Sequence, residues 1–476
     1  MKINNKEIVK LLDLDIFRSI SNASKELNVD TYVVGGFVRD LILSNKLNMD
    51  IDIMCVGSGI DLAKAFHKQI KPNITPSKIN IFKRYGTAMI SHDNYKIEFV
   101  GARKESYSKD SRNPSIEIGD FMDDMNRRDF TINTLAISLN KENYGSLIDT
   151  FNGIDDLNNG IIKTPTDPDK TFSDDPLRML RAVRFACQLD FYINKNTVES
   201  IIKNSDRIKI LSSERIADEV NKILMSKTPS NGFKNLEKLK ILNNIIPELI
   251  DLKGIEEVEG QTHKDNFYHT LEVVDNICAK TDNLWLRWAA LLHDIGKSPT
   301  KKFNKKIGWT FHGHEYVGSK MVKEIFTRLK LPLNDSMKYV QKIVMMSSRP
   351  IIIAEEIVTD SAVRRLIYDA GDSIDDLLTL CEADITTKNK RKFEKYHNNF
   401  QIVREKIKKV EEKDNIRNFQ PPVTGEIIMK HFKIGPCKEV GIIKDEIKNA
   451  ILDGEIKNNY KSAFNLMKIK GKSLGL

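Results

Sequence analysis

Gly-Gly-Phe-Val-Arg-Asp at residues 35–40 and Asp-Ile-Asp at residues 50–52 are the stretches that decide the fold. The β-branched and aromatic run at residues 31–34 predicts a strand that ends in the glycine pair. The alternation of polar and apolar residues at 50–54 predicts a second strand. Because side chains two apart on a strand point to the same face, we expect Asp50 and Asp52 to converge.

A converging pair of carboxylates predicts a metal site. Close carboxylates repel each other unless a divalent cation neutralises them, and hard oxygen ligands of this kind suit Mg²⁺, which recruits substrate phosphates to complete its octahedron. Two such ions about 4 Å apart can activate an attacking hydroxyl and stabilise a leaving pyrophosphate. An isolated Asp-x-Asp is more often a solvated strand edge, so the neighbouring residues decide between these interpretations.

The neighbouring residues favour nucleotide binding. Gly35 and Gly36 lack Cβ atoms, so the backbone can approach a triphosphate closely. Arg39 would add charge-assisted hydrogen bonds to the same phosphates. Glu98, in a strand predicted at 95–100, is a candidate third carboxylate that would deprotonate or orient an acceptor hydroxyl; the alternative is an exposed strand glutamate. We therefore predict a site for Mg²⁺ and a nucleoside triphosphate.

Composition places the chain among folded, multidomain proteins. Its 476 residues are 40% hydrophobic and 30% charged, which excludes a largely disordered chain and a membrane bundle. The five cysteines lack Cys-x-x-Cys spacing, which excludes a cysteine zinc site and a disulfide scaffold and leads us to expect a cytoplasmic protein. The net charge of +9 is compatible with a polyanionic partner.

Patterns typical of helices and of strands alternate up to about residue 150, beginning with an amphipathic helix predicted at 8–28. From residue 174 onward, the spacing of apolar residues predicts helices almost throughout. We expect an α+β fold in which a mixed α/β head is followed by an all-α neck, a helical body and a helical tail. The predicted domains are a head at 1–152, a neck at 153–255, a histidine-bearing helical domain at 256–400 and a basic tail at 401–476.

Further motifs follow in order along the first half of the chain. They are Arg-Arg-Asp-Phe-Thr-Ile-Asn at 127–133, Asp-Thr-Phe-Asn-Gly-Ile-Asp-Asp-Leu at 149–157, Asp-Asp-Pro-Leu-Arg at 174–178 and Ser-Glu-Arg-Ile at 213–216. With the glycine turn and aspartate pair, this series resembles the class II tRNA nucleotidyltransferases, the CCA-adding enzymes and their bacterial poly(A) polymerase relatives. The resemblance implies a nucleotidyltransferase head and assigns ribose and phosphate contacts to Arg128, Asp129 and Asn133.

The resemblance also implies that the neck selects the nucleotide without a nucleic acid template. Asp175 and Arg178 are three residues apart, so we expect them to share one helix face. A carboxylate accepts from the exocyclic amine of C or A, while a guanidinium donates to ring nitrogens and carbonyls. Arg181 and Arg184 would hold triphosphate. The alternative for the Asp175–Arg178 pair is an ordinary helix ion pair. Asp174 stands where the family has glutamate.

A second constellation lies in the helical half of the chain. Imidazoles with an adjacent aspartate, spread over several helices, suit a transition-metal phosphohydrolase site. The pattern resembles the HD superfamily, which implies the ligands His269, His293, Asp294 and Asp384, with His314 as an additional candidate. The segment 345–348, Met-Met-Ser-Ser, lacks a histidine that this branch would place there, which weighs against a full dinuclear site.

The leading prediction is template-independent addition of C, C and A to the tRNA 3′ end from CTP and ATP, with Mg²⁺ as cofactor, tRNA as partner and no membrane association. The alternatives are an enzyme that adds only A, to tRNA or as a poly(A) polymerase, an HD-domain metal-dependent phosphohydrolase, and a non-catalytic RNA-binding protein. The sequence leaves open the choice between CCA and A addition, the metal of the HD site, the oligomeric state and the preferred tRNA.

Overall fold

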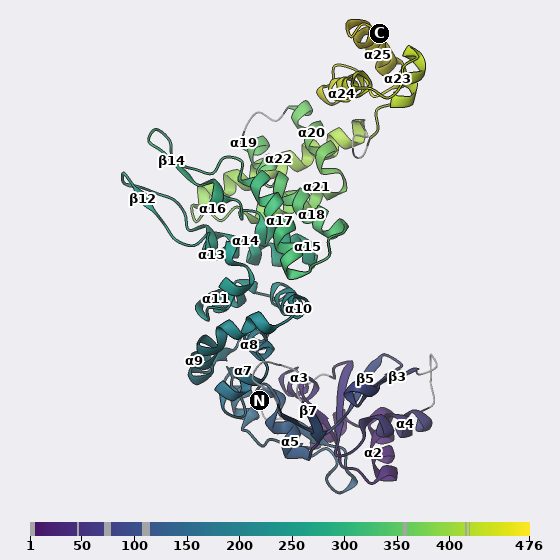
Figure 1. Cartoon of the computed structure of the whole chain (residues 1–476), viewed down its shortest axis with the longest axis vertical. Helices are drawn as coiled ribbons and strands as arrows, with labels where there is room; N and C mark the ends of the chain where they lie inside the picture. Colours follow the sequence, from purple (N-terminus) through teal and green to yellow (C-terminus); the bar gives the residue numbers. More distant parts are fainter. Residues whose placement is uncertain are drawn as a thin grey trace. The chain divides into compact units, whose positions relative to one another are not determined.

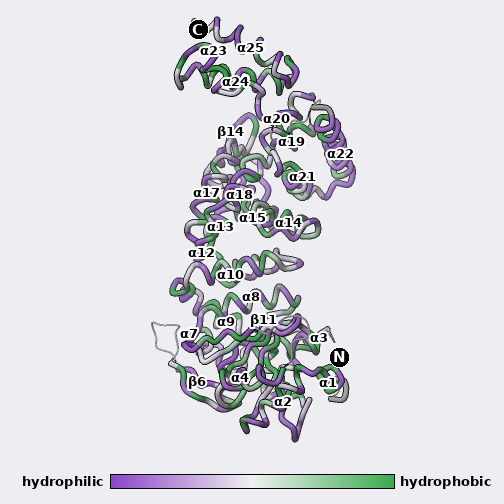
Figure 2. The backbone as a smooth tube through the Cα atoms, turned by 90° about the vertical axis from the view of Figure 1, so that its right-hand side faces the viewer, coloured by the Kyte–Doolittle hydropathy of each residue, from purple (hydrophilic) through white to green (hydrophobic). Residues whose placement is uncertain are grey.

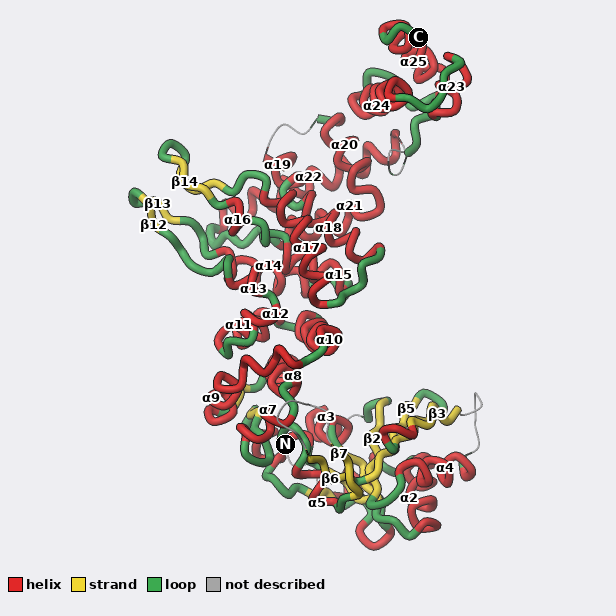
Figure 3. The backbone as a smooth tube through the Cα atoms, viewed as in Figure 1, coloured by secondary structure: helices red, strands yellow, loops and turns green. Residues whose placement is uncertain are grey.

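The computed structural model describes residues 5–44, 47–70, 78–106, 115–355, 359–414, 417 and 419–476. The chain forms two compact units: unit 1 is Met1–Ser226 with Asn231–Ile245, and unit 2 is Lys227–Ser230 with Ile246–Leu476. Strands gather in the N-terminal part and helices make up most of the remainder (Figure 3). The predicted α+β fold with a mixed head and a helical body is confirmed. The finer division at 152, 255 and 400 stays a prediction.

A seven-stranded sheet forms the head, in the order β3-β4-β5-β2-β1-β8-β9. Strands β2 and β5 pair in parallel, and the other neighbours pair antiparallel. The strand bounds are β1 Thr31–Val34, β2 Asp50–Cys55, β3 Lys78–Phe82, β4 Thr87–His92, β5 Tyr95–Gly101, β8 Ala136–Ser138 and β9 Leu147–Ile148. The strands predicted at 31–34, 50–54 and 95–100 are present.

The two faces of this sheet have different roles. Helices α2 (Asp15–Leu27) and α4 (Gly59–Gln69) pack on each other, and α4 covers the face that carries Ile51, Ile53 and Phe99 (Figure 1). Phe66 of α4 meets Phe99 with ring centroids 5.4 Å apart. Because side chains alternate along a strand, the aspartates of β2 lie on the opposite face.

The prediction of a single helix at 8–28 is wrong. The structure has two helices, α1 (Asn5–Leu11) and α2 (Asp15–Leu27), separated by Leu14 in an extended conformation with φ −114° and ψ 144°. Asp15 lies in the first turn of α2, where a carboxylate interacts favourably with the helix dipole. The Leu-Leu-Asp-Leu-Asp sequence at 11–15 therefore allows α2 to begin at Asp15, although the helical spacing of apolar residues runs on without interruption.

The remaining elements of unit 1 frame the open face of the sheet and build the neck. Helix α3 follows the glycine turn, α5 precedes the arginine pair, and the others are short helices and strand pairs. Their bounds are α3 Gly36–Ser44, β6 Arg103–Ser106, β7 Ser115–Ile118, α5 Phe121–Asn126, α6 Gly153–Asn158, β10 Ile161–Ile162, α7 Pro168–Asp174, α8 Leu177–Leu189, β11 Tyr192–Ile193, α9 Lys195–Asn204, α10 Ser213–Leu224, α11 Pro229–Lys238 and α12 Leu242–Ile245.

Unit 2 is built around helices whose core includes Trp288, fully buried against Phe326. Two short hairpins in it went unforeseen, because strands of two or three residues leave no period in the sequence. The bounds are α13 Pro247–Ile250, β12 Glu257–Val258, β13 Gln261–Thr262, α14 Asn266–Cys278, α15 Leu284–Leu292, α16 Lys297–Thr300, β14 Lys302–Asn304, β15 Gly308–Thr310, α17 His314–Leu329, α18 Asp335–Met346, α19 Arg349–Glu355, α20 Asp360–Ala370 and α21 Ile374–Ala383.

The C-terminal helices of unit 2 are α22 (Lys390–Asp414), α23 (Gly425–Phe432), α24 (Lys438–Asp453) and α25 (Tyr460–Ser473). Figure 2 shows α22 as predominantly hydrophilic, in keeping with its many lysines. Among the described residues, no helix combines the length and the apolar character needed to span a membrane.

Candidate active site

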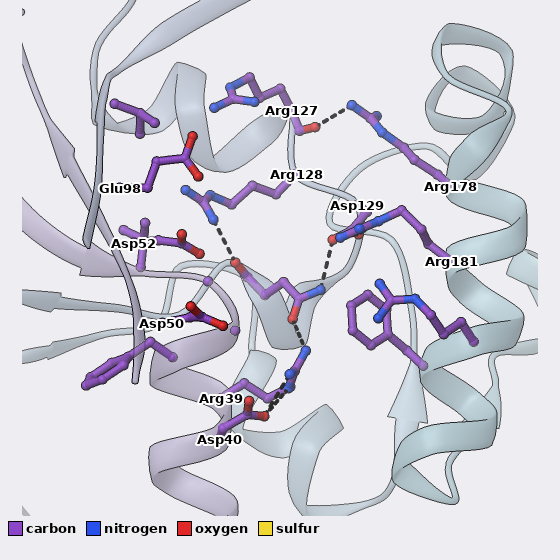
Figure 4. Close-up of a pocket in the computed structure, with 18 of the residues that line it drawn as sticks. Arg39, Asp40, Asp50, Asp52, Glu98, Arg127, Arg128, Asp129, Arg178 and Arg181 are labelled. Carbon is purple, nitrogen blue, oxygen red and sulfur yellow. Dashed lines mark hydrogen bonds and ion pairs between the residues drawn. The ribbon is translucent and has the colours of Figure 1, made fainter. Parts of the chain in front are cut away.

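Three carboxylates stand together on the open face of the head sheet. Asp50 and Asp52 project from β2, and Glu98 lies directly across from Asp52 on β5 (Figure 4). Gly35, at the end of β1, has φ +74°, a conformation that favours glycine. A Cβ atom there would lie 3.4 Å from an Asp52 carboxylate oxygen and 3.1 Å from Arg128 Nη1. The glycine therefore lets the backbone turn close beside the carboxylates.

The electrostatics of these carboxylates suit a bound cation. Desolvation raises the pKa of Asp52, an effect that Arg128 opposes and Asp50 reinforces. Desolvation and the charge of Asp52 likewise raise the pKa of Glu98. A divalent cation would relieve this repulsion, and Asp50 and Asp52 supply oxygen ligands of the kind that Mg²⁺ prefers. The donor set therefore fits the expected metal.

Asp124, which sequence analysis missed, holds both arginines of the Arg-Arg-Asp motif. Its side chain is fully buried; one oxygen accepts from Arg127 Nε at 2.9 Å, and the other accepts from Arg128 Nη2 at 2.9 Å. Burial disfavours the charged carboxylate, but the two arginines, Arg128 foremost, lower the pKa of Asp124. The spacing of three and four residues across the C-terminal end of α5 could have indicated this contact.

A chain of hydrogen bonds links the glycine turn to the neck (Figure 4). Arg39 Nη1 donates to Asn133 Oδ1 at 2.8 Å, and Asn133 Nδ2 donates to Asp129 Oδ1 at 3.0 Å. Arg181 Nε on α8 donates to the other oxygen of Asp129 at 2.7 Å. Burial opposes ionisation of Asp129, but Arg181 and the hydrogen bonds lower its pKa to about 2. Asp129 thus orients Arg181 directly and Arg39 through Asn133.

The buried Asp129–Arg181 pair should stabilise the head in a pH-dependent way. The folded pKa of Asp129, about 2, lies below its usual 3.8, so its stabilisation is present above about pH 4 and is lost as pH falls through about 2. We expect Asp129→Asn to lower the free energy of unfolding by at least about 2 kcal/mol at pH 7, and by less at pH 3. Urea unfolding followed by circular dichroism measures this difference.

The tryptophans provide an internal control for that measurement. All three, Trp285, Trp288 and Trp309, lie in unit 2, so their fluorescence reports the unfolding of that unit alone. We expect the fluorescence transition to stay unchanged in Asp129→Asn. An equal loss of stability at pH 3 and pH 7 would contradict the assigned role of the ionised carboxylate.

The Asp175–Arg178 pair does not share one helix, contrary to the sequence prediction. Helix α7 ends at Asp174, Asp175 is extended with φ −135°, and α8 begins at Leu177. Pro176 explains the break, because a proline disfavours the helical conformation of the preceding residue. Asp175 Oδ1 accepts from the Leu177 amide at 3.1 Å, and Arg178 Nη2 donates to the Arg127 carbonyl oxygen at 2.7 Å.

Phe185 supports three arginines, a feature that the sequence analysis also missed. The guanidinium carbons of Arg184, Arg39 and Arg181 lie 4.1, 4.9 and 5.2 Å from its ring centroid. Arg184 Nε further donates to the buried Glu219 on α10 at 2.6 Å. Stacking on an aromatic face and ion pairing both restrict a guanidinium group. The arginines are therefore held in place before any phosphate arrives.

One cavity of about 570 Å³ brings together every site residue predicted in the head and neck. The residues are Gly35, Gly36, Arg39, Asp50, Asp52, Glu98, Arg128, Asp129, Asn133, Asp175, Arg178, Arg181 and Arg184. The cavity thus has acidic groups on the sheet and cationic groups on the turn and the neck. This arrangement can bind a metal-complexed triphosphate and present polar groups to its base.

The predicted histidine cluster is also assembled, within unit 2. His269 Nε2 lies 2.8 Å from Asp384 Oδ1 and 3.6 Å from Asp294 Oδ2, and His293 Nε2 lies 3.4 Å from the latter oxygen. His314 Nε2 is 3.6 Å from Asp294 Oδ1. Burial favours neutral His293, yet the charge of Asp294 raises its pKa to about 10. Imidazoles and carboxylates this close suit a transition metal.

The segment that lacks the expected histidine lies at the end of α18. Ser347 Oγ donates to the Val344 carbonyl oxygen at 3.0 Å, and Ser348 Oγ donates to Glu315. Lys297 Nζ, in turn, lies 2.6 Å from Asp294 Oδ2. This lysine neutralises part of the negative charge that would hold metal ions. The site therefore suits one metal ion better than two.

A head sheet with paired aspartates beside a glycine turn, facing arginines from a helical neck, defines a nucleotidyltransferase class of fold. Residues 31–163 match the family described as the poly A polymerase head domain. Residues 190–252 match the family described as a probable RNA- and SrmB-binding site of polymerase A, and residues 266–388 match the HD domain. Three segments of the chain thus match models of the poly A polymerase family and of the HD domain, which confirms the resemblance found in the sequence.

Curated relatives resemble the chain over part of its length. An A-adding tRNA nucleotidyltransferase of Aquifex aeolicus is 38% identical over 182 residues, which cover 38% of this chain and 21% of that protein. A CCA-adding enzyme of Lactobacillus helveticus is 34% identical over 216 residues, covering 45% of this chain and 50% of that protein. The chain therefore matches half or less of each relative.

Solved structures resemble the chain over nearly all of it. A CCA-adding enzyme in complex with ATP has a TM-score of 0.65 at 22% identity and covers 98% of both chains. The Thermotoga maritima CCA-adding enzyme complexed with tRNA has a TM-score of 0.60 at 22% identity, again over 98% of both chains. At this identity the likeness concerns the fold.

Proposed function

We propose that the protein adds C, C and A to the 3′ end of tRNA from CTP and ATP without a nucleic acid template, releasing pyrophosphate. The observation that carries the proposal is the single cavity that unites a carboxylate triad, a glycine turn, phosphate-binding arginines and an Asp–Arg pair. The names of the relatives support tRNA as acceptor. We further propose the domain division at 152, 255 and 400 and a cytoplasmic location.

The proposed roles follow from where each group lies. Bound at Asp50 and Asp52, Mg²⁺ would neutralise developing charge on the phosphates and lower the pKa of the acceptor hydroxyl. Glu98, opposite Asp52, orients that hydroxyl and accepts its proton, a role that its position across from the metal-binding aspartates supports. The Gly35–Gly36 turn, Arg39 and Arg128 hold the triphosphate. Asn133, itself held by Asp129, positions Arg39, and Asp124 positions Arg128.

Base selection rests on Asp175 and Arg178. C and A both carry an exocyclic amine that a carboxylate can accept from, whereas U and G present a carbonyl oxygen at the corresponding edge. Arg178 is fixed by its hydrogen bond to the Arg127 carbonyl, so its remaining N–H groups keep a defined direction. Although the pair lies across a helix break, both side chains line the cavity. A fixed donor–acceptor pair can therefore select C and A.

A pyrophosphate-release assay tests the reaction class. The protein is incubated with a tRNA transcript that lacks its CCA end and with CTP plus ATP, or with UTP plus GTP. We expect pyrophosphate only with CTP and ATP, and only when the transcript is present. Release with all four nucleotides, or none with CTP and ATP, would contradict the proposal. An enzyme that adds only A shares the same cavity and is the principal alternative.

The histidine cluster favours a second candidate function, metal-dependent phosphoester hydrolysis. His269, His293, Asp294 and Asp384 would hold a transition metal, which when bound supplies a hydroxide nucleophile. His293 Nε2 is buried and makes no hydrogen bond of normal geometry among the described residues, as expected of a nitrogen prepared for another ligand. A phosphorylated or cyclic RNA end is the substrate class that fits an enzyme acting on 3′ ends.

The two sites should be separable. We expect His293→Ala with Asp294→Ala to abolish binding of Mn²⁺, Ni²⁺ or Co²⁺ to unit 2 and any hydrolysis that depends on these ions. Nucleotide addition should stay within about twofold of wild type, because the carboxylates and arginines of the addition site lie in unit 1. Isothermal titration with each metal and the two activity assays measure these effects. Collapse of addition with an intact circular dichroism spectrum would contradict the two-site account.

A further inference from the structure

A second cavity of about 380 Å³ adjoins the candidate active site. It shares Glu98, Val100 and Arg127 with the first cavity and is completed by Phe82, Tyr85, Thr87 and Arg103. Its volume lies within the range of small-molecule pockets. None of the roles proposed for the nucleotide uses these added residues.

The aromatic side chains of this cavity are accessible and lie on the catalytic face of the sheet. Phe82 pairs with Thr87, and Thr87 pairs with Val100, so these three residues share a face. Glu98 lies two residues before Val100 on β5 and therefore projects from the same face. Phe82 is 44% exposed and Tyr85 is 58% exposed. Large exposed rings beside a catalytic carboxylate suit a flat, aromatic ligand.

The direction of the reaction determines which ligand that is. In an in-line transfer the acceptor hydroxyl attacks from the side opposite the leaving pyrophosphate. Arg39, one of the two arginines that hold phosphate in the proposed mechanism, lies on one side of the aspartate pair, and Glu98 lies on the other, beside Arg128 (Figure 4). With the far end of the triphosphate at Arg39, the acceptor approaches past Glu98, where the second cavity opens.

The charged groups of the cavity suit a nucleotide. Arg103 Nε and Arg127 Nη1 lie 2.9 and 3.3 Å from the same oxygen of Glu105, whose side chain is only 4% exposed. Arg84, which precedes Tyr85 in the sequence, has its guanidinium carbon 6.0 Å from the Tyr85 ring centroid. Arginines beside exposed aromatic rings are the combination that binds single-stranded RNA through its phosphates and bases.

We propose that Phe82 and Tyr85 form a stacking platform for the base of the 3′-terminal nucleotide of the RNA acceptor, while Arg103 and Arg127 bind its phosphate. The inference rests on the proposed function and adds the acceptor subsite to it. Stacking is tolerant of base identity because every base has an aromatic face. Such tolerance is what successive additions require, since the terminal base changes after each step.

The test compares acceptor minihelices that carry either a normal or an abasic 3′-terminal nucleotide. Their dissociation constants are measured by fluorescence anisotropy for the wild type and for Phe82→Ala/Tyr85→Ala. We expect the abasic end to weaken binding to the wild type by roughly 5- to 100-fold. The double variant should show the same weakening with the normal end and no further loss with the abasic end.

Two further variants separate stacking from folding. Phe82→Tyr/Tyr85→Phe keeps both rings and should bind as the wild type does. Ile81→Ala removes a side chain of similar exposure on the same strand but the opposite face, and should leave the base dependence unchanged. CTP incorporation in the same samples tests the proposed function by itself: base-dependent binding without incorporation would contradict that function and support the platform. Equal effects of the abasic end on wild type and double variant would overturn the platform.

Discussion

Replacing either aspartate of β2 should abolish nucleotide addition. We expect Asp50→Ala or Asp52→Ala to lower the rate of CTP incorporation by more than about 100-fold, because these carboxylates are the proposed ligands of the metal that neutralises charge on the reacting phosphates. Affinity for tRNA should change less than about twofold, since phosphate contacts by basic side chains dominate RNA binding. Single-turnover incorporation and anisotropy measure the two quantities.

Asp61→Ala is the matched control for the aspartate variants. Asp61 lies on α4, the helix that covers the opposite face of the sheet, where it pairs with Lys64 at 3.3 Å. It should leave incorporation unchanged. Incorporation above about a tenth of the wild-type rate in both β2 variants would show that the metal is held elsewhere.

Removing Arg178 should have the second-largest effect. We expect Arg178→Ala to lower kcat/KM for CTP and ATP by about 100-fold and to raise the relative use of UTP and GTP. The physical reason is that a donor–acceptor pair covered by the base rejects a wrong base by leaving polar groups unpaired, and the truncated pair can no longer do so. Steady-state incorporation of each nucleotide separately gives the four values of kcat/KM.

Arg178→Lys distinguishes geometry from charge. Lysine keeps the positive charge but lacks the planar fork of donors, so it should restore nucleotide binding more than base discrimination. If Arg178→Ala retains the wild-type preference for CTP and ATP, then the Asp175–Arg178 pair does not read the base.

The sheet side of the site could be predicted because its determinants are local. Strand alternation alone places Asp50 and Asp52 on one face, and the Gly35 turn needs a conformation that glycine adopts readily. The pairing of Glu98 with Asp52 depends on parallel strand register, which the sequence leaves open. Its assignment from sequence therefore relied on residue type and position in a predicted strand.

The neck was predicted less well because a local rule was overlooked. Helical spacing placed Asp175 and Arg178 on one helix, but Pro176 between them ends one helix and starts the next. Asp124 and Phe185 act through contacts with arginines, and such supporting residues carry no reactive group that would single them out. The histidine cluster, by contrast, was recognised from motif order although its residues come from separate helices.

Our proposal that this one cavity adds C, C and A in sequence can be tested directly. Three transcripts of one tRNA, ending at the base before the CCA sequence, after the first C and after the second C, are each incubated with labelled CTP or ATP alone. The account predicts C incorporation on the first two transcripts and A on the third, with no incorporation of UTP or GTP. Incorporation of A on the third transcript alone, with no C added to the first two, would contradict it.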